Sequence, residues 1–156
     1  MTENKYRHTQ YGVLMLVIFV LSGVLIAYVI YEKIADGGLV SALITLFSYL
    51  FGIMMFYSFT VEIVGETLSF WFGVGLIRKT YSVKDIESVK EITNPWYYAW
   101  GIKTIPGGWF YAIAPGEAVE LVLKNGKIVQ IGTDESEKLK AAIELAMQQG
   151  RNTRSS

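Results

Sequence analysis

The chain of 156 residues contains no cysteine and a single histidine, His8. Without cysteine the chain can form neither a disulfide nor a reactive thiolate, and its cysteine content gives no indication of the cellular compartment. One histidine leaves no ordinary zinc ligand set and no Ser-His or Cys-His nucleophile pair inside a folded domain. We expect His8 to be solvated in an N-terminal tail, residues 1–10. The sequence offers no catalytic residue, metal site or cofactor site, and predicts a protein that is not an enzyme.

Charge is absent from two long apolar segments, residues 11–31 and 39–59. As a helix each would extend about 31 Å, which matches the hydrocarbon thickness of a bilayer. The alternatives are a pair of buried core helices and, for the first segment, a cleaved signal peptide. Two such segments exceed what one small core could cover, and no small-residue cleavage site follows the first. The sequence therefore predicts a two-helix membrane hairpin over residues 11–58.

The two predicted helices are joined by the short connection 32–38, so they must be antiparallel neighbours. Small residues occur at i,i+4 in each helix, as Gly23 and Ala27 and as Ser48 and Gly52. They would let the two backbones approach closely, although small residues are common in such helices in any case. Neither helix contains an ionisable side chain of the kind that a transporter or proton channel needs, which argues against transport.

The distribution of basic residues predicts the orientation of the hairpin. Lys5 and Arg7 precede the first helix, Arg78 and Lys79 follow the second, and the connection carries only Lys33. Positive residues favour the cytoplasmic side. We therefore expect an integral inner (cytoplasmic) membrane protein with two spans, whose termini and following domain are cytoplasmic. Its contact with the bilayer is expected through residues 11–59.

From residue 59 onward the hydrophobic period changes to that of strands. Residues 59–64 and 67–72 alternate, with Phe59, Val61 and Ile63 and then Leu68, Phe70 and Phe72 expected to face the core. Turn signals separate further strands at 76–83 and 85–92, and Pro106-Gly107-Gly108 separates two more. The pattern of short antiparallel strands is that of a sandwich or barrel, with about seven strands in all.

The clearest hairpin spans residues 118–132. A two-residue loop at Asn125-Gly126 would place Gln130 on the apolar face. A three-residue loop, 124–126, with Gly126 in the left-handed region instead pairs Leu121 with Val129. A slip of one residue moves every side chain to the other face, so the hydrophobic pattern favours the second register.

A single amphipathic helix is expected after the hairpin. Its apolar face comprises Leu139, Ala142, Ile143 and Ala146. Asp134 with Glu137 fits a capping box, and Gly150 is placed to end the helix. We expect the helix to cover an open end of the sheet and residues 151–156 to be disordered.

These features resemble the bacterial pleckstrin-homology-like (PH-like) family of small membrane proteins. The resembling segments are 65–89, 100–113 and 118–139, of which the last is the most specific, and the resemblance covers roughly residues 59–148. It implies a seven-stranded, strongly bent antiparallel barrel capped by a C-terminal helix, over residues 59–150. It implies no reaction, because the family is not an enzyme family.

The chain departs from the better-known phosphoinositide-binding members of the PH class. Their headgroup site uses basic residues around the loop between the first two strands, where this chain has an acid and no base (residues 64–67). Residues 59–156 contain 11 basic and 11 acidic residues, so there is no net positive field. We therefore expect no phosphoinositide site of the usual kind and no nucleic-acid binding.

Aromatic residues are concentrated in residues 95–110. Trp109 and Tyr111 are expected in the core, whereas a loop does not need three consecutive large rings at 96–98 to fold. Such rings can pack in a core or loop, lie at a membrane interface or face a protein partner. The candidate partner or membrane-interface surface comprises Trp71, Trp96, Tyr97, Tyr98 and Trp100, and the candidate headgroup contacts are Arg78, Lys79 and Lys103.

Two functions remain open from the sequence. The first is a non-enzymatic, membrane-anchored interaction or scaffold module that binds a protein partner or its own copies. The alternative is a lipid-sensing or membrane-surface-sensing domain that contacts headgroups through the aromatic loop.

Overall fold

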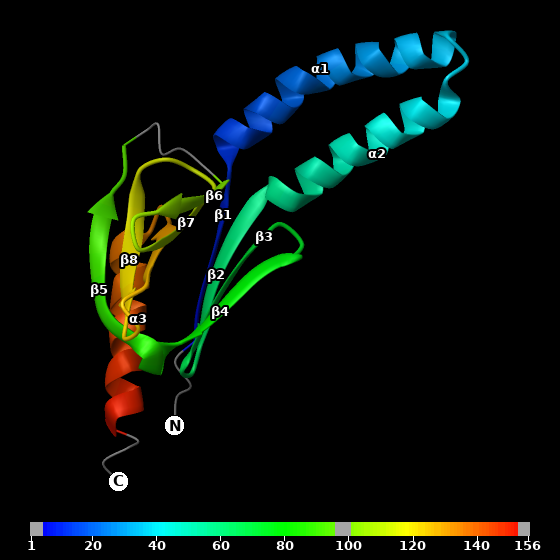
Figure 1. Cartoon of the computed structure of the whole chain (residues 1–156). Coiled ribbons are helices and arrows are strands. Elements are labelled where there is room, and N and C mark those ends of the chain that lie inside the picture. The colour runs from blue at the N-terminus through cyan, green and yellow to red at the C-terminus, as the bar shows by residue number, and fades with distance from the viewer. Residues whose placement is uncertain (1–4, 96–100, 153–156) are drawn as a thin grey trace.

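The computed structural model of the chain describes residues 5–95 and 101–152, arranged as a helical hairpin and a β-rich domain (Figure 1). The helices are α1 (Val13–Ala35), α2 (Leu39–Phe56) and α3 (Ser136–Asn152), with a short 3-10 helix η1 (Val83–Asp85). The strands are β1 (Lys5–Tyr11), β2 (Ser58–Val64), β3 (Thr67–Phe72), β4 (Ile77–Ser82), β5 (Ile86–Thr93), β6 (Gly101–Ile105), β7 (Gly108–Ala112), β8 (Glu117–Leu123) and β9 (Ile128–Gly132). This order confirms the apolar helical hairpin, the mainly-β domain and the C-terminal helix.

The described strands form two sheets. Sheet A has the order β1-β2-β3-β4, and sheet B has the order β5-β8-β9-β7-β6. Eight strands follow α2, and no ladder among the described residues joins the two sheets, so a closed seven-stranded barrel stays a prediction. The expectation of antiparallel pairing throughout was wrong for one ladder, because β7 and β9 are parallel. The intervening β8 runs antiparallel to β9, and the chain therefore returns alongside β7 in the same direction.

Residues 1–10 were expected to form a tail and Tyr11 to begin the first membrane segment, but Lys5–Tyr11 form β1. This strand pairs antiparallel with β2 along its whole length, from Lys5 opposite Val64 to Tyr11 opposite Ser58. Sheet A is therefore connected to the helical hairpin without a linker. Only Gly12 separates β1 from α1, and only Tyr57 separates α2 from β2. The Gly12 amide donates to the Tyr57 carbonyl oxygen at 3.4 Å, which joins the two connections.

The predicted core faces of the first strands are confirmed. All six predicted side chains on β2 and β3 are at most 2 % exposed: Phe59, Val61, Ile63, Leu68, Phe70 and Phe72. Leu139, Ile143 and Ala146 of α3 are buried in the same cluster, and Ala142 packs against it. The C-terminal helix therefore closes the core by its amphipathic face.

The hairpin of β8 and β9 has the register that the hydrophobic pattern favoured. Leu121 lies opposite Val129 and Glu120 opposite Gln130. Gly126 has a φ of 79°, in the left-handed region that the three-residue loop requires. The Gln130 amide donates to Glu120 at 2.8 Å on the polar face.

Strand β7 differs from its prediction because both of its faces are covered. Tyr111 belongs to the main core cluster, whereas Phe110 and Ala112 lie in a second cluster with Ile105 and Ala118. Trp109 was expected in the core but is 47 % exposed. Its side chain lies at the rim of the groove described below.

The ends of α3 also differ from the predictions. The helix begins at Ser136, so Asp134 does not occupy the position directly before it, and its carboxylate instead contacts His8. Gly150 does not end the helix, which continues to Asn152 and includes Arg151. A Cβ atom at Gly150 would lie 3.0 Å from a Glu66 carboxylate oxygen, so the residue is placed where the helix approaches the β2–β3 turn closely.

The two long helices expose apolar surface along their length. Among the residues described, α1 has no buried side chain and α2 has only Ala42 and Met55. Both helices are long and apolar enough to cross a membrane. Gly23 lies in their contact, since a Cβ atom there would lie 3.0 Å from the Tyr49 hydroxyl, whereas Gly52 has open space around it. Of the predicted small residues, Gly23 therefore contributes close approach, whereas Ala27 and Ser48 are exposed.

Candidate functional site

The structure describes only part of the surface that the sequence singled out. Trp96, Tyr97, Tyr98 and Trp100 lie outside the described residues. The described candidates fall on two separate sheets: Trp71, Arg78 and Lys79 on β3 and β4 of sheet A, and Lys103 on β6 of sheet B. Arg78 and Lys79 are also adjacent on β4 and therefore point to opposite faces of sheet A, so the candidates do not form one site.

Trp71 is the centre of a cluster on the outer face of sheet A. The Arg78 guanidinium lies 4.4 Å from the centroid of the Trp71 ring, and the Arg7 guanidinium lies 5.8 Å from it. Each arginine is also 3.9 Å from a carboxylate oxygen of Glu62. An indole ring between two guanidinium groups is stabilised by cation–π attraction. The prediction that Trp71 points away from Phe70 and Phe72 is confirmed, since those side chains are buried and Trp71 is half-exposed.

A larger hollow, which we call the inter-sheet groove, lies between β4 of sheet A and the β6–β7 and β8–β9 hairpins of sheet B. Its volume is about 830 Å³, within the range of ligand-binding clefts. Tyr81, Trp109 and Tyr111 supply aromatic surface, and Ile128 and Val129 supply aliphatic surface. The groove is therefore a half-apolar cleft with an exposed tryptophan at its rim.

Two tyrosines in the groove, Tyr81 and Tyr111, have their hydroxyls within reach of each other, and either hydroxyl could donate to the other. Burial, followed by the proximity of Tyr81, raises the pKa of Tyr111 to about 12, and burial also raises the pKa of Tyr81. Both hydroxyls therefore stay protonated at physiological pH, and the pair serves as a polar but uncharged part of the groove wall.

The charged residues that line the inter-sheet groove are mostly basic. Lys79 comes from β4, and Lys124 and Lys127 come from the β8–β9 hairpin, while Asp85 is the only acid among the lining residues that the structure describes. The groove therefore has a local positive potential that the neutral net charge of the chain conceals. Lys124 and Lys127 were not predicted as site residues, because a lysine in a hairpin turn carries no functional signal by itself.

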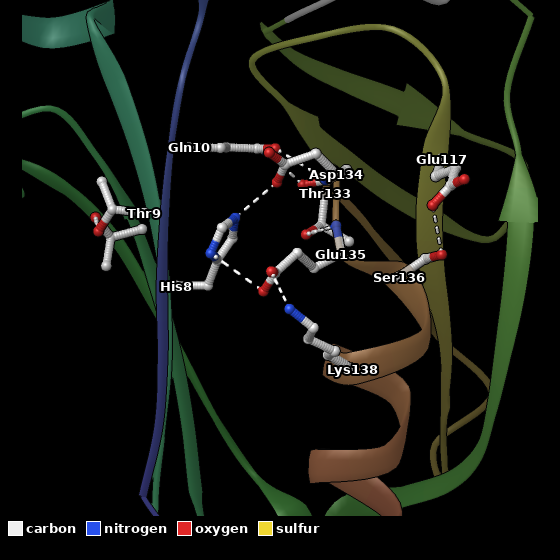
Figure 2. A network of polar contacts seen from close by, with 11 residues as sticks. His8, Thr9, Gln10, Glu117, Thr133, Asp134, Glu135, Ser136 and Lys138 are labelled. Atoms are coloured by element: carbon white, nitrogen blue, oxygen red, sulfur yellow. Dashed lines mark hydrogen bonds and ion pairs between the residues drawn. The ribbon is translucent and has the colours of Figure 1, made fainter.

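A polar network joins β1 to the beginning of α3 (Figure 2). The two ring nitrogens of His8 face separate carboxylates, with Nε2 2.6 Å from Asp134 and Nδ1 3.3 Å from Glu135. The expectation that His8 is a solvated tail residue was therefore wrong, because the pairing of β1 with β2 carries it to α3. Lys138 donates to the Glu135 carboxylate at 2.5 Å.

Gln10 extends this network along β1. Its amide donates to the Gly132 carbonyl oxygen at 2.8 Å, and its side-chain oxygen accepts from the Asp134 amide at 3.1 Å. The Gln10 side chain is 7 % exposed, and both of its polar atoms have partners. Its two hydrogen bonds and the two contacts of His8 connect sheet A to the junction between sheet B and α3, so the arrangement is structural in character.

No cluster of ionisable side chains in the described part of the chain has metal-binding geometry. Residues 5–95 and 101–152 contain no group of three or more histidine, aspartate or glutamate side chains that could hold a metal ion. His8 contacts the carboxylates of Asp134 and Glu135, and Glu135 also pairs with Lys138.

Comparison with known proteins gave no match: no family model, no curated protein and no solved structure matches this chain.

Proposed function

We propose that the chain is a non-enzymatic, membrane-anchored interaction module in which α1 and α2 cross the membrane and the β-rich domain lies at its cytoplasmic face. The exposed apolar side chains of both helices support the crossing, since such surface is unfavourable in water. The direct continuation of β1 into α1 and of α2 into β2 supports a fixed orientation of the domain against the bilayer.

The proposal includes membership of the bacterial PH-like family and a bent barrel of its kind. The order of the elements supports it: strands in two sheets, the last two forming an Asn-Gly hairpin, then one helix that buries its apolar face in the core. The seven-stranded core of that family would correspond to a subset of the strands that follow α2.

The inter-sheet groove is the observation that carries the binding function. Its aromatic surface and three lysines fit an extended protein segment in which every second side chain, the one facing the groove, is acidic or apolar. Strand β4, which pairs only with β3 among the described strands, offers a free edge beside the groove. An extended segment could add to that edge and place alternate side chains in the groove, which is a common mode of peptide recognition.

The test is selection of random peptides against the full chain in lipid nanodiscs. We expect the selected peptides to carry Asp, Glu and apolar residues at every second position, which is the face that meets the groove. Their affinity should fall at least tenfold in the double variant Lys124→Glu/Lys127→Glu, because the substitutions reverse the potential of the groove. Lys90→Glu, an exposed substitution on β5 away from the groove lining, is the matched control and should change nothing. Selection of peptides with no acidic preference, or equal loss in the control, would contradict the proposal.

The alternative function, sensing of the lipid surface, is favoured by a different observation. Trp71 lies between Arg7 and Arg78, and an indole with neighbouring cations is the residue combination that prefers the headgroup region. This cluster faces away from the core of sheet A, so lipid contact and peptide binding in the groove would use different surfaces.

A further inference from the structure

The turn between β3 and β4, residues 73–76, is fixed against the end of α2. The Gly73 amide donates to the Ser58 carbonyl oxygen at 2.8 Å. A Cβ atom at Gly73 would lie 2.1 Å from the Met54 carbonyl oxygen and 2.6 Å from that of Met55. The turn therefore lies at the same level as the last turn of α2, and Figure 1 shows it beside that end of the helix.

The side chains at this turn are apolar and unpartnered. Val74 is 53 % exposed and Leu76 is 66 % exposed. Met54 of α2, whose backbone lies against Gly73, is also exposed, so the apolar surface of the turn adjoins that of the helical hairpin. Neither exposed side chain of the turn is needed for the core of sheet A, which is filled by the opposite face of β3.

The residues next to the turn change from apolar to basic. Phe72 pairs with Ile77 beside the turn, and Trp71 pairs with Arg78 one position farther from it. The Arg78 guanidinium is stacked on the Trp71 ring, with Arg7 on the same outer face. Apolar side chains at the tip, an aromatic ring next to them and cations beyond the ring match the layers of a bilayer surface, from hydrocarbon through the interface to the lipid phosphates.

We propose that the β3–β4 turn is a third membrane contact, with Val74 and Leu76 inserted among the headgroup-proximal parts of the acyl chains of the leaflet from which α2 emerges. Trp71 then lies at the headgroup level, and Arg7 and Arg78 lie next to the lipid phosphates. This inference rests on the proposed membrane crossing of α2, because Gly73 lies against Met54 and the depth of the turn in the membrane therefore follows that of the end of α2. The occupant of the apolar tip is a phospholipid leaflet rather than a second copy or a partner protein.

The experiment uses spin-labelled single-cysteine variants of the full chain, which has no natural cysteine to remove. Val74→Cys and Leu76→Cys report on the turn, and Phe47→Cys, whose side chain is 70 % exposed on α2, reports on the span. Val64→Cys is the matched control, because it is an exposed valine at the opposite end of sheet A. Each variant is reconstituted into vesicles of phosphatidylcholine and phosphatidylglycerol, and its collisions with oxygen and with a water-soluble nickel chelate are measured.

We expect the ratio of oxygen to nickel accessibility at positions 74 and 76 to be several-fold higher than at position 64. A ratio equal to that of position 64, with position 47 in the hydrocarbon, would overturn the third contact while leaving the membrane crossing intact. Protection of 74 and 76 from both reagents would also overturn it, in favour of a protein that covers the turn. Water accessibility at position 47 would instead refute the crossing of α2 itself.

Discussion

At the scale of single residues, Tyr6 combines burial with an unsatisfied hydroxyl. Its oxygen atom is buried without a hydrogen-bond partner among the described residues. Burial, followed by the nearby carboxylates of Glu135 and Asp134, raises the pKa of Tyr6 to about 12. The native state therefore favours the neutral phenol, and it gains nothing from the hydroxyl that forms no bond.

Replacement of Tyr6 by phenylalanine should leave the protein as stable as the wild type at pH 7, or more stable. The wild type should lose stability as the pH rises from about 10 to about 12, because the unfolded tyrosine ionises first and the folded one remains protonated. Tyr6→Phe should lose less stability in that interval. Thermal unfolding of both proteins as a function of pH measures the difference.

Tyr111→Phe is the matched control for the same substitution. Its hydroxyl has that of Tyr81 as a hydrogen-bond partner, so its removal should lower the free energy of unfolding at pH 7 by about 1 kcal/mol. If Tyr6→Phe were destabilised as much as Tyr111→Phe, the Tyr6 hydroxyl would have a partner in solution, and its assignment as unsatisfied would be wrong.

At the scale of elements, β1 depends on His8 for its contact with α3. His8→Ala removes the group between Asp134 and Glu135 and should weaken the attachment by about 1 kcal/mol. Hydrogen exchange of the β1 amides should become faster, while exchange in the β8–β9 hairpin should not change. Lys5→Ala, an exposed substitution in the same strand, is the control. Unchanged protection of β1 in His8→Ala would show that the pairing with β2 alone holds the strand.

The contact of the β3–β4 turn with α2 can be tested through two glycines that share a positive φ. Gly73 (φ 48°) meets the backbone of α2, whereas a Cβ atom at Gly65 (φ 57°), in the turn at the other end of sheet A, would have no neighbouring atom within 4 Å. Gly65→Ala should cost about 1 kcal/mol from backbone strain alone. Gly73→Ala should cost about 2 to 3 kcal/mol, because the strain is joined by a clash with main-chain atoms that cannot move aside. Equal losses in thermal unfolding of the two variants would contradict the packing of the turn on α2.

Elements with a local hydrophobic period could be predicted from the sequence, and those specified by distant partners could not. The alternation of 59–64 and 67–72 and the register of the β8–β9 hairpin follow from the need to bury one face. In β1 the side chains that face inward include Tyr6, His8 and Gln10, so no apolar alternation marks it. Its partner β2 is separated from it by the whole helical hairpin.

The candidate site shows the same limit. Trp71 was identified correctly because its neighbours Phe70 and Phe72 define the buried side of β3. Trp109 was assigned to the core because alternation assumes that one face of β7 meets solvent, whereas both faces of Phe110–Ala112 are covered. The inter-sheet groove depends on how β4 lies relative to the β8–β9 hairpin, and no local pattern contains that information.

At the scale of the whole molecule, the main feature is the absence of a linker between the helical hairpin and sheet A. Tyr57 alone separates α2 from β2. The pairing of β1 with β2 extends to Tyr11 and Ser58, the strand residues nearest to the helices. Such a connection transmits the orientation of the helices to the domain. The inter-sheet groove and the β3–β4 turn would then keep a constant position relative to the membrane, which suits a module that presents a binding surface there.

The proposed function depends on the membrane crossing and its direction, and accessibility of single cysteines in spheroplasts of a bacterial host measures both. Asp36→Cys places a thiol in the exposed connection between α1 and α2, and Lys127→Cys places one at the exposed β8–β9 turn. We predict that a membrane-impermeant maleimide labels position 36 in intact spheroplasts and position 127 only after lysis. Labelling of both positions before lysis would contradict the crossing, and labelling of position 127 alone would reverse the orientation.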